Sequence, residues 1–216
     1  MPIWKYLRVI PAFFTLFACA TGPGNFDDEP GSANLSLQLS GLESSTPVVS
    51  HDGFILTFTH FALSFSQMQL GEASVEEAFS ADIFSETASG LAVLEDMAPG
   101  DYSSLALTLG MTGNPPLQGN SILLEGEARK GGSKCVLNVQ LQADGTALEV
   151  DAGDEGVSVV SGEETQLLVQ VDPNAVFAGV DLGGLCQNGA TVMISAAQNS
   201  QLAEQILGNF SSAFSL

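Results

Sequence analysis

Short segments in which apolar and polar residues alternate recur along most of the chain. Leu35, Leu37 and Leu39, for example, are separated by single polar residues. Successive side chains of a strand point to opposite faces of a sheet, so a period of two predicts half-buried strands. The alternation recurs in segments 54–58, 61–65, 105–109, 135–141 and 167–171, and shorter apolar runs occupy 122–124, 148–150, 157–160 and 191–197. Short strands at this spacing predict an all-β fold, an antiparallel β-sandwich.

The alternation changes parity once within a long apolar stretch. Phe54, Leu56 and Phe58 share one face, but the next aromatic residue is Phe61. One extra residue therefore lies at Thr59-His60, and a β-bulge or a strand that crosses between sheets would accommodate it. Further along, residues 71–90 carry mixed signals, in which Ser74 to Phe79 could form a helical turn.

Turn residues separate several of the expected strands. Gly131-Gly132-Ser133 predicts a reversal between two strands, and Asp144-Gly145 is a strong hairpin signal. The strand after the first of these turns carries Cys135 on the same face as Leu137 and Val139, so we expect the Cys135 side chain to point inward.

Two segments have helical rather than strand periodicity. Asp172-Pro173 would begin a short helix that runs through Phe177, because proline suits the first helical turn. In residues 199–214 apolar side chains recur every four residues, which predicts a C-terminal amphipathic helix with Asn199 at its N-cap. Its polar face carries no Lys or Arg, so packing on the sheets is favoured over docking to a bilayer.

The first 18 residues have the composition of a secretory signal peptide. Lys5 and Arg8 precede an apolar run from Val9 to Ala18. The run has about ten residues, whereas a membrane-spanning helix needs roughly 20. We therefore expect export of the chain rather than anchoring by a helix.

The residues at the end of this run, Leu16-Phe17-Ala18-Cys19, resemble the lipobox of bacterial lipoproteins, although Phe17 occupies a position that usually carries a small residue. The resemblance implies cleavage before Cys19 and a lipid on that cysteine, and the absence of Asp at position 20 points to the outer membrane. Residues 19–33, rich in Gly, Pro and acids, would be a flexible tether, and residues 34–216 the folded domain. The alternative is cleavage after Ala20, which would give a freely secreted protein.

A second resemblance concerns one predicted strand. Pro99-Gly100-Asp101-Tyr102 ahead of alternating leucines is similar to a motif that begins a strand in prealbumin-like sandwich domains of bacteria. These domains are mostly binding or structural modules without a shared catalytic site. The resemblance supports an Ig-like or prealbumin-like sandwich and implies no activity.

The charge of the chain excludes some partners. The formal net charge is −20, and removal of the signal would leave Arg129, Lys130 and Lys134 as the basic residues. Such a surface repels nucleic acid and anionic lipid headgroups, so membrane attachment would depend on the lipid. The three cations cluster at a predicted hairpin tip, where they would form a solubilising turn, an internal ion pair or a contact with an acidic partner.

Three cysteines are an odd number for an exported protein. Lipidation or removal of Cys19 leaves Cys135 and Cys186 as a pair, and an oxidising compartment favours a disulfide between them. The bridge would close a loop of about 51 residues, worth roughly 4 kcal/mol in the chain-entropy model.

No catalytic constellation stands out in the sequence. His51 and His60 are the only histidines, and neither G-x-S-x-G nor S-x-x-K occurs. A hydrolase could use a pair of carboxylates, but a chain with 25 acidic residues offers so many pairs that their presence does not indicate such an enzyme. Apart from Trp4 and Tyr6 in the signal, Tyr102 is the only Tyr or Trp, which argues against an aromatic carbohydrate-binding platform.

One acidic, glycine-rich loop contains candidate metal ligands. Asp151, Asp154 and Glu155 lie close together in sequence, and carboxylate oxygens suit calcium. The spacing is not that of a calcium hand, and an ordinary acidic turn is the alternative interpretation.

The leading functional hypothesis is a non-enzymatic, lipid-anchored protein of the cell envelope that acts as a binding or structural module without a cofactor, with an envelope protein as its partner. A calcium-dependent adhesion module is the second hypothesis, and a hydrolase with an unmarked site is the third.

Overall fold

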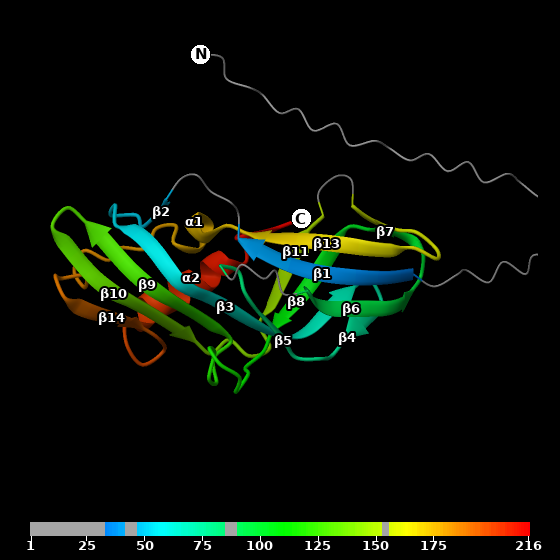
Figure 1. Ribbon diagram of the computed structural model, residues 1–216, viewed down its shortest axis with the longest axis horizontal. Coiled ribbons are helices and arrows are strands. Elements are labelled where there is room, and N and C mark those ends of the chain that lie inside the picture. The colour runs from blue at the N-terminus through cyan, green and yellow to red at the C-terminus, as the bar shows by residue number, and fades with distance from the viewer. Residues whose placement is uncertain (1–32, 42–46, 85–89, 153–155) are drawn as a thin grey trace, which may run out of the picture.

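The computed structural model describes residues 33–41, 47–84, 90–152 and 156–216 (Figure 1). Strands account for most of this part of the chain, so the expected all-β class is confirmed. Its two larger sheets are mixed rather than purely antiparallel, because each contains one parallel pair of strands. The expected antiparallel arrangement is therefore wrong for these two pairs of strands and holds for the other pairs.

The first sheet contains four strands in the order β15 (Phe214–Ser215), β13 (Glu164–Val171), β1 (Ala33–Gly41) and β6 (Gly90–Met97). β1 lies in the centre, parallel to β13 and antiparallel to β6. Leu37 is aligned with Leu167 on one side and with Ala92 on the other. The alternating leucines of β1 are fully or almost fully buried, as period two requires.

The second sheet is built around the long strand β3 (Ile55–Leu70). Its main path follows the order β11 (Ala147–Asp151), β8 (Ser104–Leu109), β3, β9 (Ile122–Lys130), β10 (Ser133–Leu141) and β14 (Ala190–Ile194). Three short strands, β2 (Val48–Val49), β4 (Ala73–Val75) and β5 (Phe79–Asp82), also pair with β3. A separate two-stranded sheet joins β7 (Gly100–Tyr102) to β12 (Val157–Val159).

β3 contains two bulges, of which the sequence predicted the first. Phe58 is aligned with Gly126 and His60 with Glu125, so Thr59 is the extra residue, within the expected Thr59-His60 position. A second register shift separates Phe65 from Gln67 opposite β8. Each bulge returns the apolar side chains of β3 to the core face after a change of parity.

One continuous apolar core connects the two larger sheets and the helices. In Figure 1 the second sheet extends along the molecule, with β9, β10 and β14 towards one end and β8 and β11 towards the other, where the first sheet lies beside them. Helix α2 (Ser200–Phe210) packs near β10 and β14, and its Phe210 ring lies 6.1 Å from that of Phe61 in β3.

Both helices are shorter than the sequence predicted. α1 (Pro173–Val176) begins as expected, with the Asp172 side chain accepting a hydrogen bond from the backbone N–H of Asn174. The expected helix 199–214 ends at Phe210, because the next residues turn the chain and Phe214 pairs with β13 in β15. Among the described residues no helix is long and apolar enough to cross a membrane.

Cys135 and Cys186 lie at disulfide distance, with 1.95 Å between their Sγ atoms. Cys135 is buried in β10, facing inward as the alternation predicted, and Cys186 lies in the loop that precedes β14. The bridge therefore ties this loop to the strand with which β14 pairs. The two cysteines are 51 residues apart in sequence.

We predict that Gly126→Ala destabilises the protein, because a Cβ there would lie 2.1 Å from the Thr57 carbonyl oxygen across the first bulge. Relief of this overlap requires the strands to separate, at a cost of about 1–3 kcal/mol. Gly132→Ala is the matched control, because nothing lies within 4 Å of a Cβ at that position in the β9–β10 turn. Urea unfolding of both variants measures the difference, and equal midpoints would contradict the close approach at the bulge.

Candidate functional site

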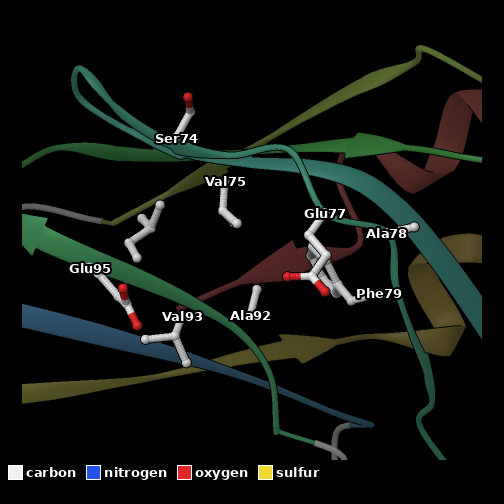
Figure 2. A pocket seen from close by; sticks show the side chains of 9 residues that line it. Ser74, Val75, Glu77, Ala78, Phe79, Ala92, Val93 and Glu95 are labelled. Carbon is white, nitrogen blue, oxygen red and sulfur yellow. The ribbon is translucent and has the colours of Figure 1, made fainter.

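The clearest candidate site is a groove between the two larger sheets, here called the β4–β6 groove (Figure 2). It has a volume of about 530 Å³. One wall comes from β4, β5 and the link between them, and the other comes from β6. The lining residues are Ser74, Val75, Glu77, Ala78, Phe79, Ala92, Val93, Leu94 and Glu95.

Both walls of this groove are sheet edges. Within the described part of the chain β6 pairs only with β1, and β4 and β5 pair only with β3. Each strand therefore has one side without a hydrogen-bonded neighbour strand. Such an edge presents backbone N–H and C=O groups that can pair with another extended segment.

The side chains of the groove combine an apolar floor with acidic margins. Figure 2 shows Val75 projecting into the gap between the walls. Phe79 and Ala92 are buried at its base, and Val93 on β6 is 48% exposed. Glu77 and Glu95 are exposed, and neither forms an ion pair with a described residue. An extended peptide with apolar and basic side chains would complement this surface.

The basic cluster is committed to internal contacts. Arg129, Lys130 and Lys134 lie at the end of the β9–β10 hairpin, as expected, and both Arg129 and Lys134 form ion pairs with Glu127. Hydrogen bonds from Lys134 and Arg129 lower the pKa of the Glu127 carboxyl. Lys130 donates a hydrogen bond to the Asp52 carbonyl. Of the interpretations considered, the structure supports the internal ion pair.

Asp52 connects the turn before β3 to a distant loop. Burial raises the pKa of its carboxyl, but hydrogen bonds from the Ser50 hydroxyl and from the backbone N–H groups of Leu182 and Gly183 outweigh this, and the net pKa is lowered. The Ser50 Oγ to Asp52 Oδ1 distance is 2.6 Å. A Cβ on Gly183 would lie 2.8 Å from the carboxylate, so only glycine permits this approach.

The two histidines lie in different surroundings. His51 is exposed in a turn, and its backbone N–H donates to Val180. His60 follows the first bulge, with Nδ1 2.8 Å from Asp82 Oδ2. The second Asp82 oxygen accepts from the backbone N–H groups of Phe61 and Phe84. This is a base held by a carboxylate, but in the described chain no hydroxyl or thiol is hydrogen-bonded to His60, as a nucleophile would be.

The candidate calcium loop and the lipidation site lie largely outside the described residues. Asp154, Glu155 and Cys19 are not among them, and Asp151 is described only as the last residue of β11. Among the described residues no group of three or more His, Cys, Asp or Glu side chains could hold a metal ion. Calcium binding and lipidation therefore stay predictions.

No protein-family model, no curated protein and no solved structure matches this chain. The β4–β6 groove was not predicted from the sequence, because its walls lie in segments without a clear alternation of apolar and polar residues. A signal for β6 was present, because Ala92 and Leu94 alternate as in a half-buried strand and Met97 follows after one irregularity.

We predict that Asp52→Asn lowers stability near neutral pH by up to about 1 kcal/mol, a small effect because solvent screens the group. The folded-state pKa of Asp52 lies below the ordinary pKa of an aspartate carboxyl, so the carboxylate stabilises the fold at pH values above that ordinary pKa. This stabilisation is lost as the pH falls through the folded-state pKa, and the variant and the wild type should then converge.

Unfolding free energies measured from about pH 7 down to about pH 3 test this dependence. The control is Asp181→Asn, which removes an exposed carboxylate from the neighbouring loop. A deficit in Asp52→Asn that does not change with pH would show that the effect comes from packing rather than from charge.

Proposed function

We propose that this chain is a non-enzymatic, lipid-anchored protein of the bacterial cell envelope that binds an extended segment of a partner protein by strand addition. The observation that carries the proposal is the β4–β6 groove, where two sheet edges that no other described strand pairs with face each other across an apolar floor. Strand addition uses main-chain hydrogen bonds for affinity and alternate side-chain pockets for specificity.

The dimensions and the charge of the groove fit this role. A volume of about 530 Å³ lies within the range of roughly 300–1,000 Å³ that is usual for ligand sites. Glu77 and Glu95 favour a segment that carries Lys or Arg, and the net charge of −20 would speed its approach. Apolar side chains of the segment would lie against Val75 and Phe79.

The cellular location of the protein is part of the same proposal. The lipobox-like sequence at Cys19 and the apolar run before it support export and lipidation, with the outer membrane as the destination. The shared core of the two larger sheets and the Pro99–Tyr102 motif support a prealbumin-like sandwich as the architecture. A freely secreted form, cleaved after Ala20, is the alternative address.

The anchor predicts a definite mass. Protein isolated from the membrane fraction of its own cells should begin at Cys19 and carry acyl chains, and it should move to the soluble fraction in a Cys19→Ser variant. Intact mass spectrometry reads both forms. A mass that corresponds to a chain beginning at Thr21 without acyl chains would contradict the lipid anchor and indicate free secretion.

Strand addition predicts that the groove selects extended peptides. A random peptide library panned against the domain should enrich sequences that bear Lys or Arg, and their binding should slow amide hydrogen exchange in β6. Ala78→Trp should weaken this binding by about tenfold or more, because an indole on the exposed wall would fill the groove.

The matched control is Ala178→Trp, which adds the same ring at an exposed alanine away from the groove. Both variants should unfold at the midpoint of the wild type, so that a loss of binding cannot come from misfolding. If no peptide protects β6, or if the two variants bind equally well, the groove is not a strand-addition site.

A further inference from the structure

A second concave surface lies at the opposite end of the β9–β10 hairpin from the basic tip. Two adjoining cavities of about 370 Å³ and about 230 Å³ share Asn120 and Gln140. They extend over the outer face of the second sheet, from the Pro115–Gln118 loop to the turn that follows β14. We call this surface the amide-lined hollow and define it by Gln118, Asn120, Glu125, Gln140 and Gln142.

The residues that define the hollow are four side-chain amides and one carboxylate, and the Ser195 hydroxyl lies at its margin. Asn120 Nδ2 donates to the Leu117 carbonyl at 2.8 Å, which leaves the amide oxygen of Asn120 as an acceptor. The side chains of Gln118 and Gln140 form no hydrogen bond with the described residues. Each of these two amides offers both donors and an acceptor to a ligand.

The carboxylate is held in position by a neighbouring strand. Glu125 Oε1 accepts a hydrogen bond of 2.9 Å from Asn138 Nδ2 on β10. Glu125 is half-buried, and its other oxygen has no hydrogen-bond donor among the described residues. Asn138 is therefore a positioning residue that fixes one acceptor at the margin of the hollow.

Apolar groups supply the rest of the surface. Leu117 packs with Ala62 and Leu123 in a small buried cluster that is separate from the main core. This cluster fixes the loop onto the outer face of the sheet. Pro115 is exposed and Pro116 half-buried, so their ring C–H groups remain available beside the amides.

We propose that the amide-lined hollow binds a neutral, polyhydroxylated ligand, namely an uncharged glycan. The hydroxyl groups of a ligand both donate and accept hydrogen bonds, as side-chain amides do. They therefore complement the amides of the hollow better than a charged group of a ligand would. The rings of Pro115 and Pro116, which are exposed and half-buried, would contact the C–H face of a sugar, and the buried Leu117 would hold their loop in place. This ligand is distinct from the peptide segment proposed for the β4–β6 groove, and neither site depends on the other.

Other ligand classes fit less well. An anion would meet Glu125 and a chain of net charge −20, with the three described cations at the far end of the hairpin. A cation would find a single carboxylate, and the described chain holds no group of three or more His, Cys, Asp or Glu side chains that could bind a metal ion. Both edges of β10 are paired as far as Val139, the residue before Gln140, because β9 pairs with one edge from Ser133 to Leu141 and β14 with the other from Cys135 to Val139.

The test is an array of oligosaccharides that includes neutral glucans and chitin fragments, uronic-acid oligomers and glucosamine oligomers, probed with the whole protein. We expect binding of neutral glycans alone. The double variant Gln118→Ala/Gln140→Ala should weaken it by about tenfold or more, as expected for the loss of two hydrogen bonds. Gln187→Ala, an exposed glutamine near the basic tip, is the control and should bind as the wild type does.

A second readout separates binding from folding. Titration of a bound neutral glycan should shift the side-chain amide NMR signals of Gln118 and Gln140, and the unliganded variants should unfold at the midpoint of the wild type. No binding across the whole array at millimolar glycan, a preference for charged oligomers, or binding that the double variant retains would each overturn the proposal. None of these outcomes bears on peptide binding in the β4–β6 groove.

Discussion

The structure depends on one constraint, which is that the single strand β3 must serve two different halves of the molecule. It pairs with β9 along its first part and with β8 along its second, and β2, β5 and β4 lie along its other edge. Among its core-facing side chains, Phe61 lies beside Phe210 of α2, and Met68 belongs to the core that the two larger sheets share. In a regular strand of 16 residues, alternate side chains stay on one face from end to end. Because the apolar positions of β3 change parity along the sequence, a regular β3 would turn some of them away from the core.

The two bulges remove this conflict, and glycines opposite them make room for the displaced backbone. Gly126 faces the Thr57 carbonyl at the first bulge, and a Cβ on Gly110 would lie 2.6 Å from Ser66 Cβ at the second. Both contacts involve atoms that cannot move without shifting a strand. The loop after Gly110 then carries the chain from β8 to β9, which places Leu117 and the amide-lined hollow on the outer face of the sheet.

Local patterns predicted the strands well because burial on one face leaves a record in the sequence. Alternation located β1, β3, β8, β10 and β13, and the spacing from Phe58 to Phe61 located the first bulge. The second bulge was missed, although the step from Phe65 to Met68 changes parity in the same way. Asp144-Gly145 does form a turn, but its flanking strands pair with β9 and β8 rather than with each other, so it does not close a hairpin.

Features that depend on distant parts of the chain left no comparable record. Nothing local marks β13 as a parallel neighbour of β1, or β14 as one of β10. The segment from Ser74 to Phe79, where a helical turn was considered, instead forms β4, a link and the start of β5. The β4–β6 groove arises only when this segment meets β6 from the other sheet. The amide-lined hollow could not be predicted from the sequence either, because Asn and Gln residues are common on the surface of any soluble domain.

Charge and tethering together determine how such sites would work. The described cations lie at one hairpin tip, held largely by Glu127 and Asp52, so neither the groove nor the hollow contains a basic residue. Recognition at the hollow then rests mainly on the hydrogen bonds of neutral side-chain amides, each worth only about 1 kcal/mol net, with the Glu125 carboxylate as one further acceptor. Such affinities are weak in dilute solution. A lipid anchor at Cys19 would hold the domain beside partners in the same envelope, where an effective concentration in the millimolar range makes weak sites sufficient. The proposed anchor and the shallow polar hollow are therefore consistent with each other, since a freely diffusing protein would need a deeper and more apolar pocket for the same occupancy.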